Sequence, residues 1–275
     1  MSSRGDSTIA ERSPHLTELQ VTRSRGSFPP VPAVCAVTGG TGFVGARLVE
    51  MLVERGAQEV RVLDVVPPPE TAWRHKRVRY VVGDICSEET VAKFVAGADC
   101  VWHNAAAVGP FHPRALYFEV NYQGTLNVIR ACRAAGVRKI VMSSSPSTRF
   151  DGADVDGLTE AQMPSLPQAR YLQTYAETKA MGEKACTDAC DAELMTVAVA
   201  PHQVYGPRDN LFLPNLLEAA GTHEDPASVI MLGSTDALRV PSGSETNYAY
   251  ATSKAGLHWL TKHLSLELGP RCITV

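Results

Sequence analysis

The sequence predicts an α/β fold in which helices cover both faces of a doubly wound parallel sheet. Short apolar runs alternate with amphipathic helical patterns from about residue 33 to residue 199. A glycine-rich turn, Thr38–Gly45, separates the first apolar run from the first helix. The second apolar run ends on an acidic residue, Asp64. Together these three observations predict a Rossmann-like sheet whose ligands bind at the carboxyl ends of its strands.

The glycine turn predicts a dinucleotide site. Glycine allows a tight turn, lets the backbone approach a pyrophosphate and lets the helix pack closely on the strand. Free N–H groups at the helix start would hold the phosphates at the positive end of the helix dipole. Asp64 follows Gly39 by 25 positions, where a carboxylate would bind a ribose 2′-hydroxyl and repel a 2′-phosphate. The predicted cofactor is therefore NAD. The alternative is a plain glycine-rich turn.

The remaining elements follow in strict alternation. The helix after the turn has apolar positions at Val44, Leu48, Met51 and Leu52. Acidic residues in the first turn of the predicted helix 88–95 suit its dipole, and Gly136 ends a long predicted helix. The expected strands are 33–37, 59–63, 78–82, 100–103 and 138–145, and the expected helices after 88–95 are 114–135 and 170–190.

Two polar residues stand where the third and fourth predicted strands end. Asp84 is placed to touch an adenine, and Asn104 is placed to touch the cofactor ribose. The alternative is that both side chains only cap turns.

A tyrosine and a lysine define the predicted catalytic group. Tyr175 and Lys179 are four positions apart on a predicted helix and so lie on one face. An ammonium beside a phenol favours the phenolate, which brings tyrosine toward use as a base near neutral pH. The same lysine can hold the nicotinamide ribose, and Ser145 is placed to fix a substrate hydroxyl. We therefore expect hydride transfer to nicotinamide while Tyr175 accepts the hydroxyl proton.

From Val34 to about Gly221 the chain resembles an extended short-chain dehydrogenase/reductase. More narrowly, it resembles the 3β-hydroxysteroid dehydrogenase family, in particular its decarboxylating sterol-4α-carboxylate 3-dehydrogenases. The stretches that carry the resemblance are Thr38–Gly45, Val120–Thr125 with Asn127-Val128, Ser143–Ser145, Tyr175–Lys179 and Pro201–Asp209.

The resemblance implies an NAD-dependent oxidation of a 3β-hydroxysteroid or sterol, with Ser145, Tyr175 and Lys179 as the catalytic residues. It also implies a sterol-like substrate, a cytoplasmic chain peripheral to the endoplasmic reticulum membrane, and a homodimer as the assembly to test. The implied cofactor contacts are Gly39, Thr41, Gly42, Phe43, Val44, Gly45, Asp64, Asp84, Asn104, Ala105, Ala106, Tyr175, Lys179, Pro201 and Val204.

The chain departs from the family pattern at several positions near the site. Ala200 stands where relatives usually carry an arginine before the Pro-His step. Pro146 and Arg149 follow the serine run, where small or apolar residues are usual. None of these changes removes a proposed catalytic group, but they bear on the shape of the pocket.

The chain after a predicted helix at 211–220 no longer follows the family, so its substrate domain is truncated or replaced. A second strand–Ser–loop–Tyr-x-x-x-Lys–helix unit contains Ser234, Tyr250 and Lys254 and resembles a classical single-domain short-chain dehydrogenase. It lacks a glycine-rich turn of its own. We interpret it as a relic of fusion or of gene-model joining; the alternatives are a replacement substrate domain or a dimer face. The expected domains are a disordered leader (1–30), an NAD-binding domain (31–222) and this extra unit (223–275).

Composition narrows the function classes. The 275 residues are 44% hydrophobic with a net charge of −3, which gives no basic surface for nucleic acid. No apolar run reaches membrane-spanning length. The seven cysteines lack metal-ligand or disulfide spacing, so no metal is expected and a reducing compartment fits. Cys186 and Cys190 are four apart, as a packed helix face or a metal pair would be.

Other functions on this scaffold stay open. A nucleotide-sugar epimerase or dehydratase, or a dihydroflavonol-type reductase, would use the same fold. A truncated NAD-binding chain without catalytic activity is the alternative from a different class.

Overall fold

The computed structural model describes residues 30–109, 112–152, 159–201 and 204–209. The chain divides into two units, residues 1–204 and 205–275. All helices and strands described below belong to the first unit. In the second unit the described residues are 205–209, where the Asp209 N–H donates to the Gly206 carbonyl at 2.9 Å.

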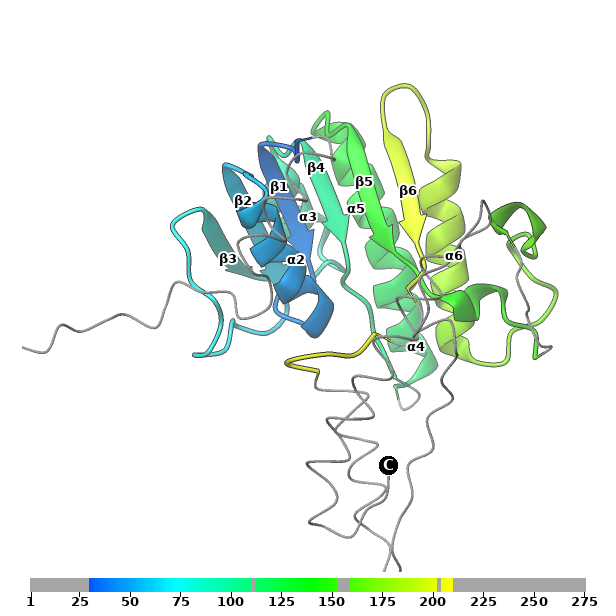
Figure 1. The fold of residues 1–275 in the computed structure, drawn as a ribbon. Coiled ribbons are helices and arrows are strands. Elements are labelled where there is room, and N and C mark those ends of the chain that lie inside the picture. The colour runs from blue at the N-terminus through cyan, green and yellow to red at the C-terminus, as the bar shows by residue number, and fades with distance from the viewer. Residues whose placement is uncertain (1–29, 110–111, 153–158, 202–203, 210–275) are drawn as a thin grey trace, which may run out of the picture. The chain divides into compact units, whose positions relative to one another are not determined.

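The first unit is built on one six-stranded sheet in which every strand pair is parallel (Figure 1). Its order is β3-β2-β1-β4-β5-β6, so the chain moves outward from β1 in one direction and then returns to continue in the other. This confirms the predicted doubly wound sheet. The strands are β1 (Val34–Thr38), β2 (Glu59–Asp64), β3 (Val78–Val82), β4 (Cys100–His103), β5 (Lys139–Ser143) and β6 (Met195–Val199).

Helices connect all successive strands except β2 and β3, which residues 65–77 join without a helix, so the alternation is not strict there. Ser87 caps α3 by accepting a hydrogen bond from the Thr90 N–H, as a serine before an acidic first turn should. The α-helices are α2 (Phe43–Glu54), α3 (Glu88–Val95), α4 (Arg114–Tyr117), α5 (Thr125–Ala134) and α6 (Thr174–Asp188); η2 (Phe118–Gly124) is a π-helical turn region, and η3 (Pro146–Arg149) and η4 (Glu160–Gln162) are 3₁₀ helices.

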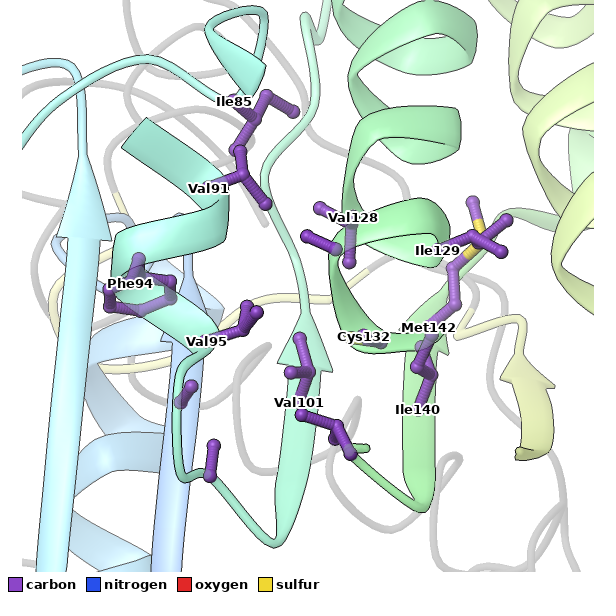
Figure 2. Packing of buried hydrophobic residues seen from close by; sticks show 14 of the residues in the cluster. Ile85, Val91, Phe94, Val95, Val101, Val128, Ile129, Cys132, Ile140 and Met142 are labelled. Atoms are coloured by element: carbon purple, nitrogen blue, oxygen red, sulfur yellow. The ribbon is translucent and has the colours of Figure 1, made fainter. Parts of the chain in front are cut away.

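Alternation along β1 separates two apolar clusters. Cys35 and Val37 pack with Val49 and Leu52 of α2 on one face of the sheet. Ala36 points to the opposite face and belongs to the larger cluster, to which α3, α5 and α6 contribute. Figure 2 shows that larger cluster between α3, α5 and the strands β4 and β5; its labelled members are Ile85, Val91, Phe94, Val95, Val101, Val128, Ile129, Cys132, Ile140 and Met142.

The buried face of α2 matches the predicted one in part. Leu52 is buried and Leu48 packs against the same cluster, but Val49 and Val53 are buried as well and Val44 is 40% exposed. Apolar residues occupy nearly every side of this helix, so its sequence does not define one face. Val44 also lies in the first turn, next to the glycine turn, where the predicted ligand would bind.

Three boundaries also differ from expectation. The long helix expected over 114–135 is formed by α4, η2 and α5 in succession, with a π-helical middle. The expected strand 138–145 ends at Ser143, because Pro146 begins a 3₁₀ helix that Ser145 caps. The expected helix 170–190 starts only at Thr174 and ends at Asp188.

Several expectations lie outside the described residues. They are the leader up to residue 29, the helix at 211–220, and the second unit with Ser234, Tyr250 and Lys254. In the described ranges, no helix combines the length and apolar character that a bilayer crossing requires.

Candidate active site

The glycine turn packs tightly against its surroundings. Gly39 has a positive φ of 67°, and its N–H donates to the Leu63 carbonyl at 2.8 Å. A Cβ on Gly39 would lie 2.7 Å from the backbone nitrogen of Ala105, and one on Gly45 would lie 2.1 Å from the Gly39 carbonyl oxygen. Side chains therefore do not fit at either position. A Cβ on Gly42 would meet only the Gly39 carbonyl oxygen, at 3.5 Å, so this position faces open space.

The start of α2 is suited to bind an anion. Gly42 is its N-cap residue, no side chain caps the helix, and its first turn holds no acidic residue. The positive end of the helix dipole therefore faces the open side of the glycine turn, and no carboxylate of the helix's own first turn occupies it. Phe43 and Val44 form this first turn. A pyrophosphate fits both the open space at Gly42 and the donors that follow it.

Asp64 lies beside the same turn. Its Oδ2 accepts hydrogen bonds from the Thr41 N–H at 3.1 Å and from the Thr41 hydroxyl at 2.5 Å. The carboxylate at the end of β2 is therefore fixed next to the glycine turn, 23 residues away in sequence. This is the position that recognition of an adenosine ribose requires.

Asp84 and Asn104 both lie at strand ends but make different contacts. The exposed Asp84 accepts a hydrogen bond from the Cys86 N–H at 2.9 Å, which is the turn-capping arrangement. The Asn104 side chain instead accepts a hydrogen bond from the Ser143 hydroxyl and so joins the ends of β4 and β5. Both residues lie at the edge of the sheet where the strands have their carboxyl ends.

The other predicted cofactor contacts are spread along this edge. The Ala105 N–H donates to the Thr38 hydroxyl at 3.2 Å, which fixes the segment after β4 to the end of β1. Ala106 is half-buried in the same segment. Pro201 and Val204 follow β6 and are both exposed.

The catalytic candidates come from α6 and from the segment after β5. Lys179 is buried, and its Nζ donates to the Ser143 carbonyl at 2.7 Å. Tyr175 lies one turn earlier on α6, and the Ser145 hydroxyl is close enough to favour its ionised form. Ser145 also shares a hydrogen bond with the Ser147 hydroxyl, at 2.9 Å. The structure thus brings all three predicted catalytic side chains to the end of β5.

The electrostatics of this group differ from the sequence argument. Burial raises the pKa of the Tyr175 phenol, and the hydrogen bond from Ser145 only partly opposes this. The expected lowering by a neighbouring ammonium is not seen. Burial also lowers the pKa of Lys179 to about 8, although Glu183 acts in the opposite direction. The chain alone therefore holds the phenol neutral at physiological pH.

Asn121 is a site residue to which the sequence argument assigned no role. It is fully buried in the π-helical η2. Its side chain exchanges two hydrogen bonds with the backbone of Ala107 and donates a third to the Thr178 hydroxyl, at 3.2 Å. It therefore ties the segment after β4 to α6, next to Lys179. The only signal in the sequence is its place in the 120–125 stretch.

His103 has a structural role. It is buried, with Nδ1 2.8 Å from the Thr38 hydroxyl and Nε2 3.0 Å from the Thr125 hydroxyl. Burial lowers its pKa to about 3, so the ring is neutral. It holds the end of β1, and with it the glycine turn, against α5.

The cysteines that the structure describes form no metal-ligand group. The six described cysteines are free, and among the described residues no group of three or more His, Cys, Asp or Glu side chains could hold a metal ion. Cys186 is buried in the larger apolar cluster, whereas Cys190 is exposed. The packed-face interpretation of this pair therefore fits Cys186.

The sheet order, the glycine turn and the Tyr-x-x-x-Lys helix define a protein of the short-chain dehydrogenase/reductase class. The chain belongs to the 3-beta hydroxysteroid dehydrogenase/isomerase family, whose family model matches residues 36–238.

Curated relatives agree with this assignment. The human sterol-4-alpha-carboxylate 3-dehydrogenase, decarboxylating, is 38% identical over 189 residues, which cover 68% of this chain and 48% of that protein. The 2-alkyl-3-oxoalkanoate reductase of Stenotrophomonas maltophilia is 38% identical over 185 residues, covering 67% and 54% of the two chains. The chain thus spans about half the length of the curated relatives that it matches.

Solved structures show the same fold. A UDP-galactose 4-epimerase superposes with a TM-score of 0.60 at 28% identity, covering 71% of this chain and 65% of that one. The Thermus thermophilus UDP-glucose 4-epimerase, solved in complex with NAD, has a TM-score of 0.56 at 31% identity and covers 64% and 57%.

Proposed function

We propose that this chain binds NAD and oxidises the 3β-hydroxyl of a steroid or sterol. One observation carries the proposal: Tyr175 and Ser145 lie together at the end of β5. Lys179 binds the Ser143 carbonyl at the same strand end. This group adjoins a sheet edge that also carries the glycine turn and Asp64. Family membership and the names of the curated relatives support the substrate class.

Each side chain has a defined task in this reaction. The Ser145 hydroxyl holds the substrate hydroxyl, and the Tyr175 oxygen accepts its proton. Since only the phenolate can accept that proton, Tyr175 must first lose its own, and in the chain alone the Ser145 hydroxyl favours that loss while burial opposes it. When bound, NAD supplies the acceptor for the hydride that leaves the carbinol carbon. The hydroxyl proton thus passes to Tyr175 and the hydride leaves the carbinol carbon, so the substrate becomes a ketone.

Cofactor binding follows from the glycine turn and Asp64. The open space at Gly42 and the uncapped start of α2 would receive the pyrophosphate. Asp64 would accept the 2′-hydroxyl of the adenosine ribose and repel a 2′-phosphate. Asp84, Asn104, Ala105, Ala106, Pro201 and Val204 are proposed to line the remainder of the same edge.

A sterol substrate partitions into membranes, so we propose a cytoplasmic chain that works peripherally at the endoplasmic reticulum. The dimer, the leader (1–30) and the domain boundary at 222–223 remain predictions. Sedimentation velocity of the full chain measures the oligomeric state directly.

A nucleotide-sugar epimerase is the second candidate, because solved epimerases share the fold at 28–31% identity. One experiment separates the two. The full chain is incubated with NAD and either a 3β-hydroxysterol or a UDP-hexose, and absorbance of the reduced cofactor is followed with Tyr175→Phe as control. Sterol-dependent reduction that the variant lacks supports the proposal. Epimerised sugar without net reduction would favour the epimerase. NAD binding without turnover of either compound would favour a non-catalytic chain.

A further inference from the structure

Three residues of α6 contact one short segment after β5. Tyr175, Lys179 and Glu183 are spaced four apart and therefore follow one side of the helix. Tyr175 meets Ser145, Lys179 binds the Ser143 carbonyl, and Glu183 contacts the residues on both sides of Ser145. The proposed reaction uses the first two and leaves Glu183 without a role.

Glu183 is a buried carboxylate with several partners. Glu183 is only 4% exposed. One oxygen forms an ion pair with Arg149 at 2.6 Å. The other accepts hydrogen bonds from the Ser144 hydroxyl and, at 3.2 Å, from the Thr148 hydroxyl. A carboxylate this deeply buried is stable only when it is paired and hydrogen-bonded in this way.

These partners hold Ser145 from both sides. Ser144 immediately precedes it, and the Thr148 hydroxyl shares its one proton between Glu183 and the Ser145 carbonyl, whose oxygen lies 2.8 Å away. Ser145 is the N-cap of η3, which ends at Arg149, so the ion pair fixes the far end of the same turn. Arg149 is one of the departures from the family pattern, and the structure gives it a partner.

We propose that Glu183, paired with Arg149, is a positioning residue that holds the Ser145 hydroxyl against Tyr175. This inference rests on the proposed function, since it assigns Glu183 a part in the same site. It touches neither substrate nor cofactor in this role. Glu183 affects the reaction only by fixing the position of the Ser145 hydroxyl.

Charge and position must be separated in the test. In the described structure the charged groups packed around Glu183 are Lys179 and Arg149. Loss of the carboxylate would remove a negative charge, and that loss by itself favours the Tyr175 phenolate. The same loss would lower the pKa of Lys179 and so disfavour its ammonium form. Thr148→Val avoids both effects, because it changes no charge and removes one hydroxyl, which contacts Glu183 and the Ser145 carbonyl and accepts a hydrogen bond from Arg149 at 3.1 Å.

The first measurement needs no turnover. Tyrosine labelled with ¹³C at Cζ reports the pKa of Tyr175 in the full chain, with Tyr175→Phe to assign the signal. A misplaced Ser145 hydroxyl stabilises the phenolate less, so we expect Thr148→Val to raise this pKa by about half a unit or more. The rise should disappear when Ser145→Ala is already present. A pKa unchanged by Thr148→Val, or a rise that persists without the Ser145 hydroxyl, would overturn the proposal.

The second measurement is kinetic. With NAD and a 3β-hydroxysterol, Glu183→Gln and Thr148→Val should each lower kcat about tenfold while the KM for NAD changes less than about twofold. Glu177→Gln is the matched control. Glu177 is a carboxylate of the same helix, but its ion-pair partner is Arg114, which does not belong to the segment around Ser145. An equal loss of kcat in that control would contradict a positioning role.

The two measurements also keep two failures apart. If the wild-type chain oxidises no sterol but Thr148→Val raises the Tyr175 pKa through Ser145, the proposed substrate is wrong and the positioning stands. If the wild-type chain is active and the pKa does not move, Glu183 has no positioning role. Melting temperatures of all variants identify any that fail to fold, and Glu183→Gln and Thr148→Val provide two independent tests.

Discussion

The carboxylate of Asp64 is bound by Thr41 of the glycine turn, at 2.5 Å from the hydroxyl and 3.1 Å from the N–H. Two segments that are 23 residues apart therefore hold one negative charge beside the predicted pyrophosphate site. This contact fixes the carboxylate before any ligand arrives, so binding need not order it. We therefore predict that the cofactor preference of the chain can be changed at this one residue.

We expect Asp64→Ser to shift the preference from NAD toward NADP. The carboxylate accepts a hydrogen bond from a 2′-hydroxyl and repels a 2′-phosphate, so its removal weakens NAD binding and relieves the repulsion. The ratio of the two dissociation constants, measured by calorimetry, should change by at least about tenfold. Thr41→Val retains the charge and should keep the preference for NAD. A ratio that is the same in wild type and Asp64→Ser would remove Asp64 from the cofactor site.

The glycine turn allows a matched pair of substitutions. Gly45→Ala places a Cβ 2.1 Å from the Gly39 carbonyl oxygen and should destabilise the fold by roughly 1–3 kcal/mol. Gly42→Ala meets only ordinary contact at 3.5 Å and should leave stability nearly unchanged. Because its methyl group enters the open space at the start of α2, Gly42→Ala should weaken NAD binding instead. Urea unfolding and NAD titration of both variants test this; intact NAD affinity in Gly42→Ala would contradict the placement of the pyrophosphate.

His103 gives the fold a defined sensitivity to acid. Its pKa is lowered by burial to about 3 in the folded chain, against an ordinary value of 6.5. The unfolded chain therefore binds the extra proton between these values, and stability falls as the pH drops below about 6.5. Between pH 7 and pH 5 the wild type should lose about 2 kcal/mol more unfolding free energy than His103→Gln. Urea unfolding at the two pH values measures this, and parallel losses in both proteins would show that His103 does not titrate in this way.

The elements that the sequence predicts well are those set by local pattern. The five strands listed from the sequence all form, in the predicted order, and α3 and β4 begin and end at the predicted residues; only the helix that strict alternation would place between β2 and β3 is absent from the described structure. Asp64 could be placed because its distance from the glycine turn is set by one strand–helix–strand unit. Tyr175 and Lys179 could be paired because a helix repeats every 3.6 residues.

The features that escaped prediction depend on tertiary contacts. Arg149 and Glu183 are 34 residues apart, and their pairing requires that α6 lie against the segment after β5. The apolar pattern of the sequence gives no sign of the π-helical register that buries Asn121. The raised pKa of Tyr175 follows from burial, which neighbouring sequence does not reveal. Each of these lies within the candidate site, where local preference alone does not set the structure.

Transfer of hydrogen from a labelled substrate gives the sharpest test of the proposed oxidation. The full chain is given NAD and a 3β-hydroxysterol that carries deuterium on the carbon of the hydroxyl group, and the cofactor is analysed by mass spectrometry. We expect one deuterium in each reduced nicotinamide and a loss of labelled product of at least about a hundredfold in Tyr175→Phe. Unlabelled cofactor, or equal labelling in the two proteins, would contradict it.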